Sequence, residues 1–200
     1  MSFKIDSISL TRSGFDILQA VNLYINSGQT TVIVGPNGAG KSSFIKVLSG
    51  DLAPTYGRII FNGKALIAWR SEHRARMISV LPQHSSLDFP FTALEVVLLG
   101  RIPHRSGIFR DTEIAREALQ ALDAMHLEGR LFTKMSGGEK QRVQLARVIA
   151  QIWEPTSTGA QFLVLDEPTA ALDLSHQVLM MELVSDFAQR GIGVIIVSVS

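Results

Sequence analysis

The sequence predicts an α/β protein with a parallel sheet, an antiparallel β region at its start and an inserted run of helices. Three observations predict this fold class. Strand-like segments fill residues 4–61, helical patterns dominate residues 84–153, and apolar strands alternate with helices from there onward. Such alternation is typical of parallel sheets, because each crossover between strands needs a helix. We expect one domain over 1–200, with the core and β region in 1–83 and 154–200 and the helical part in 84–153.

The antiparallel region is predicted from three short strands. They cover Lys4–Thr11, Ala20–Ile25 and Gly57–Phe61, and in the second of them every other residue is apolar. The third strand runs into Asn62-Gly63, a dipeptide that favours a tight hairpin turn because both positions tolerate positive φ. This region should therefore flank the segment that follows the second strand.

That segment is a glycine-rich loop between a predicted strand, Thr30–Val34, and a predicted helix, Lys41–Leu48. It fits the pattern G-x-x-x-x-G-K-[ST], whose backbone N–H groups surround phosphates at the positive end of a helix. Lys41 should neutralise phosphate oxygens and the Ser42 hydroxyl should ligate Mg²⁺. An ordinary glycine-rich turn is the alternative. The candidate ligands are Gly35, Pro36, Asn37, Gly38, Ala39, Gly40, Lys41, Ser42 and Ser43.

The helical part contains three predicted helices. A capping box, Thr92 with Glu95, precedes the first, and a 3.6-residue apolar period predicts the second over Asp111–Met125. The third starts near Ser136 and runs to about Trp153, before a polar loop over residues 154–160.

The last part of the chain places two acids after a buried strand, Phe162–Leu165. Asp166 should therefore emerge at the carboxyl edge of the sheet, where it can hold Mg²⁺ through water, and Glu167 is our candidate for polarising an attacking water. The alternative is a charged pair that merely ends a strand. A helix over Ser175–Arg190 and a strand over Val194–Val199 complete the pattern.

The segment Ser136-Gly137-Gly138-Glu139 has two readings. Ser136 with Glu139 is a capping box, and many helices begin this way without binding anything. Two consecutive glycines, however, leave backbone N–H groups bare, which suits a phosphate better than it suits helix stability.

Composition limits the remaining classes. Nineteen basic and 18 acidic residues give a formal charge of +1, so no excess charge favours nucleic acid, and the basic cluster at Arg70, His73, Arg74 and Arg76 is predicted to be a solvated helix face. The chain has no cysteine, no apolar run long enough to span a membrane and no secretory signal in its first residues.

Together, the loop, the Ser136 segment and the acidic strand end resemble the motifs of ATP-binding cassette (ABC) transporter ATPases. The resemblance covers almost the whole chain and implies a P-loop NTPase (RecA-like) core, with ATP and Mg²⁺ as cofactors. It implies that Gln83 contacts Mg²⁺ as the Q-loop glutamine and that Asp173 belongs to the D-loop, although Asp173 could also cap the next helix. The Ser136–Glu139 segment would face the nucleotide of a second copy, so a homodimer is expected.

The segment Gly100-Arg101-Ile102-Pro103-His104 is similar to importer ATPases for iron chelates, vitamin B12 and haem. The phenylalanine-rich stretch before it, the helix end at Arg147–Trp153 and the segment Ala171–Gln177 look most like the haem branch of that group. This resemblance implies a peripheral subunit at the cytoplasmic face of the inner membrane, bound to permease subunits, served indirectly by a periplasmic or surface substrate-binding protein, and without nucleic acid. The alternatives are a siderophore or vitamin B12 importer, a soluble ABC ATPase that acts on ribosomes or DNA, and a regulatory module that does not hydrolyse ATP.

Two departures from the family pattern stand out. The family usually places an aromatic residue near the start of the chain to stack on adenine, and here Phe15, in the segment Thr11–Phe15, is the only ring near that position. The family's switch histidine should follow the last strand, and we expect the chain, which ends at Ser200, to be truncated before it. His176 follows the D-loop, and His73, His84, His104 and His126 lack metal-ligand spacing, so none is assigned to that role.

Overall fold

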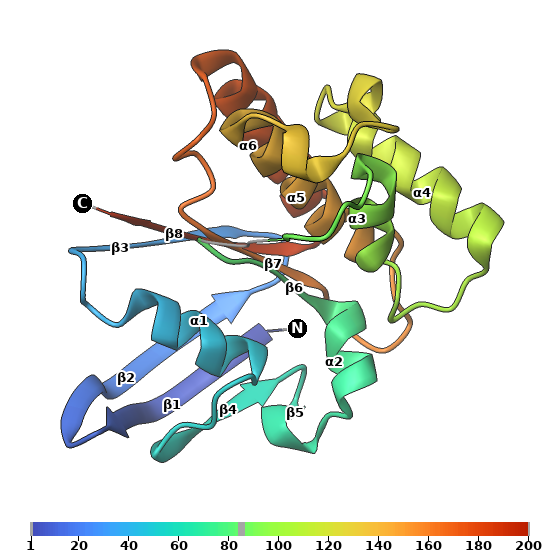
Figure 1. Cartoon of the computed structure of the whole chain (residues 1–200). Coiled ribbons are helices and arrows are strands. Elements are labelled where there is room, and N and C mark those ends of the chain that lie inside the picture. Colours follow the sequence, from blue (N-terminus) through green and yellow to red (C-terminus); the bar gives the residue numbers. More distant parts are fainter. Residues whose placement is uncertain (1, 84–86, 200) are drawn as a thin grey trace.

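Two sheets and six α-helices make up the computed structural model, which describes residues 2–83 and 87–199 (Figure 1). One sheet is antiparallel, with strand order β2-β1-β4-β5, and the other is parallel, with order β3-β8-β7-β6. The strands are β1 (Ser2–Arg12), β2 (Phe15–Asn26), β3 (Thr30–Gly35), β4 (Tyr56–Phe61), β5 (Lys64–Ala65), β6 (Ile78–Leu81), β7 (Phe162–Asp166) and β8 (Gly193–Val199).

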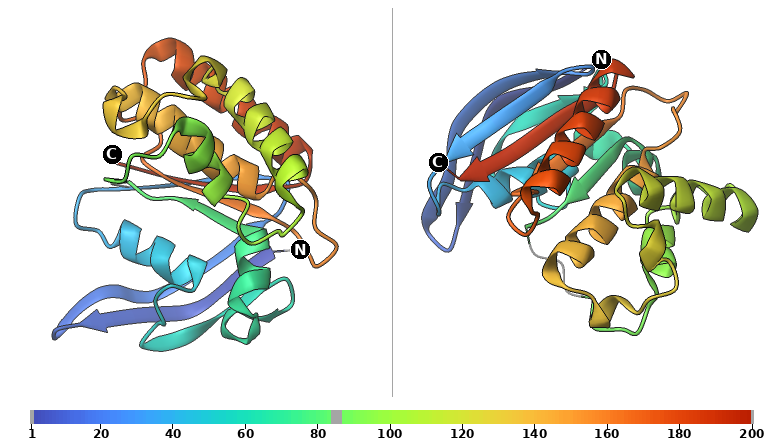
Figure 2. Two further views of the ribbon diagram at one scale, coloured as in Figure 1. Left: turned by 45° about the vertical axis from the view of Figure 1, so that its right-hand side comes forward. Right: turned by 90° about the horizontal axis from the view of Figure 1, so that it is seen from above.

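The helices separate into two layers. Helix α1 lies between the two sheets, whereas α3, α4, α5 and α6 lie on the other side of the parallel sheet (Figures 1 and 2). The helices are α1 (Lys41–Ser49), α2 (Ser71–Met77), α3 (Ala93–Leu99), α4 (Ile108–Ala121), α5 (Gly137–Gln151) and α6 (Leu174–Gln189), with 3₁₀ turns η1 (Leu66–Ala68), η2 (Met125–Leu127) and η3 (Phe132–Lys134).

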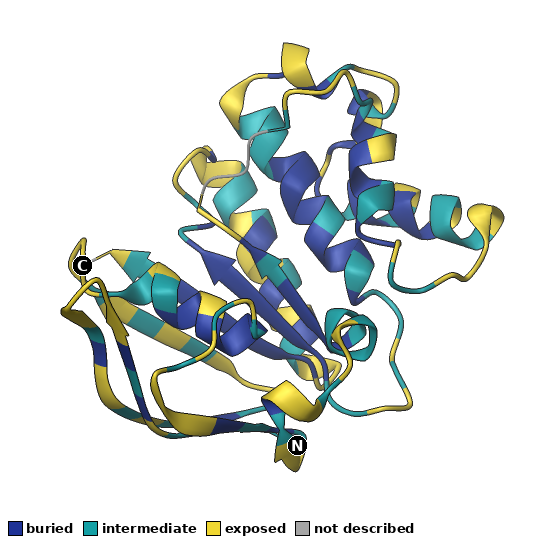
Figure 3. Cartoon of the chain, turned by 60° about the horizontal axis from the view of Figure 1, so that its bottom comes forward, coloured by how far each residue is buried: buried dark blue, intermediate teal, exposed yellow. Residues whose placement is uncertain are grey.

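Packing on both faces of β7 explains why residues Phe162–Leu165 are all apolar. Phe162 and Val164 pack into the cluster between the sheets, while Leu163 and Leu165 pack into the cluster under α3–α6. A parallel strand covered on both faces needs apolar residues at every position, and β7 is buried along its whole length (Figure 3). Gly193 on the neighbouring strand is required, because a Cβ there would lie 2.2 Å from the Phe162 ring.

Several predictions are confirmed. The α/β class, the antiparallel start and the alternating end are all present. Asn62 and Gly63 join β4 to β5 with φ of 48° and 77°, as expected for the tight turn. Thr92 and Ser136 each begin a helix with a complete capping box.

The predicted helix over Asp111–Met125 is wrong at both ends, since α4 runs from Ile108 to Ala121. Asp123 has φ of 48°, a left-handed conformation that no α-helix can continue through. Met125 therefore lies in the separate turn η2 and is 37% exposed, although Leu122, just after the end of α4, is buried.

The prediction that Arg70, His73, Arg74 and Arg76 form a solvated helix face is also partly wrong. Arg70 is exposed, but Arg74 and Arg76 on α2 are half-buried. Arg74 donates to Gly50 O at 3.4 Å and Arg76 donates to Pro103 O at 2.7 Å, so these arginines join segments distant in the sequence.

No helix among the described residues is long and apolar enough to cross a bilayer. The predicted helical part starts at His84, and residues 84–86 lie outside the described residues, so its first boundary is not tested.

Candidate nucleotide site

The glycine-rich loop connects β3 to α1 at one edge of the parallel sheet. Gly38 and Gly40 have φ of 81° and 83°, in the left-handed region that glycine adopts without strain. A Cβ on Gly40 would lie 2.6 Å from Ile17 O, so the loop approaches the β2 backbone too closely for any other residue. The Lys41 ammonium donates to Gly35 O at 2.6 Å and to Pro36 O at 2.9 Å, which holds it inside the loop.

The loop lines a cavity of about 370 Å³, and residues from distant segments complete its wall. Gln83, from beyond β6, and Glu167, from beyond β7, lie on it beside the loop. The structure therefore brings together three of the predicted site segments. The lining residues are Ile17, Asn37, Gly38, Gly40, Lys41, Ser42, Ser43, Gln83 and Glu167.

Ser42 and Asp166 form the first polar pair of the site. Ser42 Oγ donates to Asp166 Oδ2 at 3.0 Å across 124 positions of sequence. Burial at the end of β7 raises the pKa of Asp166, and the Ser42 hydrogen bond opposes that rise. A hydroxyl and a carboxylate oxygen this close are the hard oxygen donors that Mg²⁺ prefers, so the residues present fit that ion.

Gln83 and Glu167 form the second pair. Gln83 Nε2 donates to Glu167 Oε2 at 2.8 Å. The Glu167 backbone has φ of 47°, which is uncommon for a non-glycine residue, and its N–H donates to Val197 O at 2.9 Å. The neighbouring strand thus holds Glu167 in a strained conformation that directs its carboxylate to the loop, and such strain is typical of functional positions.

Ser136 is the N-cap of α5, and the four residues of its segment do not line the cavity of the same chain. Ser136 and Gly137 are exposed, and a Cβ on Gly137 would meet no atom within 4 Å. A Cβ on Gly138 would lie 3.1 Å from Ala171 O, so this turn packs beside the predicted D-loop. The open face of Gly137 is therefore free to meet another molecule.

Asp173 caps α6, as one of its two predicted roles requires. Its Oδ1 accepts from the backbone N–H of His176 at 2.9 Å, from Ser175 Oγ at 2.8 Å and from His176 Nδ1 at 2.7 Å. These bonds, the His176 N–H first, lower the pKa of Asp173 to about 2. The carboxylate remains exposed beside the turn that Gly138 contacts.

Sequence reasoning missed Ile17 and Arg147. Ile17 lines the loop cavity although it belongs to the antiparallel sheet, while Phe15 is 76% exposed and does not line it. Arg147 lines an adjacent cavity of about 420 Å³ together with Ser42, Gln83 and Asp166. The apolar alternation of β2 gave no sign of the first role, and the helical period of α5 gave none of the second.

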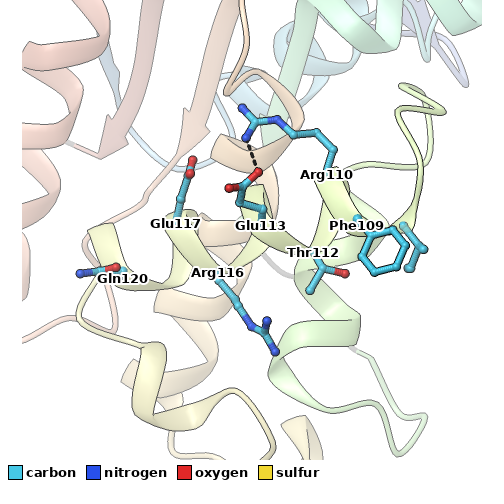
Figure 4. A pocket seen from close by; sticks show the side chains of 8 residues that line it. Phe109, Arg110, Thr112, Glu113, Arg116, Glu117 and Gln120 are labelled. Atoms are coloured by element: carbon cyan, nitrogen blue, oxygen red, sulfur yellow. Dashed lines mark hydrogen bonds and ion pairs between the residues drawn. The ribbon is translucent and has the colours of Figure 1, made fainter.

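A further hollow, of about 870 Å³, lies along α4 and is separate from these residues (Figure 4). Phe109 at its end is 91% exposed, and Arg110 pairs with Glu113 at 2.6 Å. None of the predicted site residues lines it, so its size does not mark the chemical centre.

Residues 18–170 match the ABC transporter family, so the chain belongs to that family and is one of its ATP-binding ATPase subunits. Hemin import ATP-binding protein HmuV of Gloeobacter violaceus is 48% identical over 196 residues, which cover 97% of this chain and 71% of the relative. HmuV of Pseudomonas fluorescens strain Pf-5 is 45% identical, with 97% and 75% covered.

Two solved structures are similar in fold. A dimeric bacterial ABC transporter cassette has a TM-score of 0.86 at 26% identity and covers 98% of this chain and 87% of its own. An ABC transporter described as of the metal-chelate type, in an inward-facing conformation, has a TM-score of 0.77 at 30% identity, with 98% and 72% covered.

Proposed function

We propose that this chain binds and hydrolyses MgATP as one half of a homodimer that powers haem import through a membrane permease. The convergence of Ser42, Asp166, Gln83 and Glu167 on the glycine-rich loop carries the proposal for hydrolysis. The HmuV relatives, which are named hemin import ATP-binding proteins, support haem as the cargo.

The loop binds the triphosphate. Its backbone N–H groups and the positive end of α1 face the phosphates, and Lys41 moves its ammonium from the Gly35 and Pro36 carbonyls to phosphate oxygens. Ile17 supplies an apolar wall beside the loop. The remaining loop residues, Asn37, Ala39 and Ser43, shape the cradle.

Mg²⁺, when bound, neutralises charge on the β- and γ-phosphate oxygens. Ser42 Oγ and Asp166 Oδ2 are the side-chain atoms that would hold it, with Gln83 beside them. The Ser42 hydroxyl and, through water, the Asp166 carboxylate would supply the hard oxygen atoms that this ion prefers.

Glu167 is the proposed general base. Its carboxylate accepts a proton from the attacking water while the water oxygen bonds to the γ-phosphorus and the bond to the bridging oxygen breaks, which releases ADP. Gln83 fixes the orientation of that carboxylate through their 2.8 Å hydrogen bond. Movement of Gln83 would therefore change the alignment of the base.

The Ser136–Glu139 segment completes the site of the other copy in the dimer. Its bare N–H groups at Gly137 and Gly138 suit a γ-phosphate, and they do not line the cavity of their own chain. Asp173 is exposed two residues after Ala171, whose carbonyl lies beside Gly138, and it is proposed to contact the opposite subunit. Closure of two copies around two nucleotides would then pull on the permease at the cytoplasmic membrane face.

Replacing Glu167 with Gln tests the mechanism. We expect ATP binding to stay unchanged and hydrolysis to slow by about 10²- to 10⁴-fold, the usual contribution of a general base. Undiminished turnover would remove Glu167 from its role. Haem uptake into vesicles that hold the permease and this subunit, compared with a siderophore and vitamin B12 as cargo, tests the transport assignment.

A further inference from the structure

Arg130 joins the loop before α5 to the first turn of that helix, and it lies outside every motif described above. Its Nη1 donates to Glu139 Oε1 at 2.7 Å, and its Nη2 donates to Lys134 O at 3.0 Å. A single guanidinium thus spans both sides of the Ser136 turn. The planar fork of arginine suits this two-way contact, whereas lysine would present a single ammonium without that fixed geometry.

Glu139 transmits this contact to Ser136. Its second oxygen, Oε2, accepts the backbone N–H of Ser136 at 2.7 Å, while Ser136 Oγ accepts the Glu139 N–H at 3.3 Å. The bonds from Ser136 are the main reason that the pKa of Glu139 is lowered, and the charge of Arg130 adds to them. The same carboxylate therefore connects Arg130 with the N-cap of α5.

The backbone of Arg130 is itself fixed. Its N–H donates to Leu127 O at 2.8 Å, and its carbonyl accepts the Ala93 N–H at 3.0 Å. Thr92 and Leu131 form an antiparallel bridge beside it. Although the Arg130 side chain is 48% exposed, it starts from an anchored point at the beginning of α3. A side chain with a fixed origin can position its partner, whereas a freely moving one contributes little.

We propose that Arg130 is a positioning residue for the Ser136–Gly138 turn and acts through Glu139. It holds the Glu139 carboxylate in the capping geometry, so that the N–H groups of Gly137 and Gly138 stay aligned. It also offsets a negative charge at the place where a triphosphate must approach. The inference rests on the proposed function, because the aligned N–H groups matter for the nucleotide of the second copy.

The first test follows the turn in the chain without nucleotide. Arg130→Gln should speed amide hydrogen exchange at Ser136, Glu139 and Lys140, whose N–H groups are hydrogen-bonded within this turn, by about 2- to 5-fold, because the helix start loses one of its supports. Arg116→Gln is the matched control, since Arg116 forms an exposed pair with Glu128 at 2.7 Å in the same helical part. It should leave exchange at residues 136–140 unchanged.

The second test is a double-mutant cycle in ATP hydrolysis. Arg130→Gln should lower kcat by roughly 5- to 30-fold, the scale of a small misplacement of catalytic groups, with the Kd for ATP unchanged. Arg130→Lys keeps the charge but not the fork, and should give an intermediate kcat. In a Glu139→Gln background, Arg130→Gln should change kcat by less than about 2-fold, because the group it acts through is already neutral.

Equal losses from Arg130→Gln in both backgrounds would overturn the route through Glu139, and a kcat and exchange pattern like those of Arg116→Gln would overturn the positioning role altogether. If Arg130→Gln lowers the melting temperature, its lower kcat could come from lost folding. In that case the kcat of Arg130→Lys decides whether Arg130 positions the turn. A wild-type chain that binds ATP but does not hydrolyse it contradicts the proposed function instead, and the exchange experiment still decides the role of Arg130.

Discussion

Replacing Arg101 with Met should cost more stability than any change at an exposed ion pair. The Arg101 side chain is 1% exposed and makes four hydrogen bonds: Nε to Asp111 at 2.9 Å, Nη1 to Ala150 O at 2.8 Å, and Nη2 to Ser106 at 2.9 Å and Glu154 at 3.0 Å. Its loss would leave Asp111, only 15% exposed, without its cationic partner.

The size of the effect follows from burial. Removing one partner of a buried ion pair costs about 3–5 kcal/mol, because the other charge stays desolvated. For a chain of this length each kcal/mol shifts the melting temperature by about 2–4 °C, so we expect a fall of roughly 6–20 °C. Arg58→Gln is the control, since its pair with Asp6 is 72% and 37% exposed, and it should cost less than about 1 kcal/mol.

Urea and thermal unfolding of the nucleotide-free chain measure both variants. Adding Asp111→Leu to Arg101→Met should recover part of the loss, because it removes the unpaired charge. A loss of less than about 1 kcal/mol in Arg101→Met, or no recovery in the double variant, would refute the reasoning from desolvation.

Three further predictions concern the candidate site. Gly137→Ala should leave ATP binding unchanged and lower hydrolysis by at least about 10-fold, because its Cβ would occupy the open face that is proposed to meet the nucleotide of the second copy. Gly138→Ala should melt at a lower temperature than Gly137→Ala, because its Cβ would lie 3.1 Å from Ala171 O whereas that of Gly137 would meet no atom within 4 Å. Equal melting temperatures of the two variants would contradict this. Burial raises the pKa of Asp166 above its usual 3.8, so the folded state disfavours the ionised carboxylate. Stability therefore falls as the pH rises from 3.8 through the raised pKa of the folded state. Asp166→Asn should therefore raise the melting temperature at pH 7, by an amount that shrinks toward pH 3, and a lower value at pH 7 would reverse the assignment. The pKa of Asp173 is lowered to about 2, so its ionised carboxylate contributes fully to the stability of the fold above pH 3.8, and this contribution is lost as the pH falls toward 2. Asp173→Asn keeps the cap acceptor, and the dependence of unfolding on pH between 4 and 2 should become shallower; an unchanged slope would count against the cap.

Local signals predicted most of the fold. The turn at Asn62-Gly63, the capping boxes at Thr92 and Ser136 and the apolar run of β7 all depend on residues within a few positions of one another. The end of α4 could not be predicted this way, since apolar periodicity continues to Met125 while the left-handed Asp123 breaks the helix.

The candidate site was likewise predicted where the signal is local in sequence and missed where it is not. The glycine-rich pattern and the acids after β7 were predicted from local sequence, and the structure brings them within hydrogen-bond distance of each other. Gln83 came only from resemblance, because a glutamine after a proline carries no signal of its own. Outside the site, the burial of Arg101 could not be predicted from the sequence. Its partners lie 5 to 53 positions away, and only the folded chain shows that this charge is buried.

The alternation along β7 has a practical consequence for studying movement in this protein. Val164 and Leu165 are neighbours in the chain, yet they face separate layers of packed side chains. A spectroscopic label placed at one or the other would report on the layer next to the antiparallel sheet or on the layer under the helices. Since both labels share one rigid backbone, a difference between them would reveal which layer rearranges when nucleotide binds.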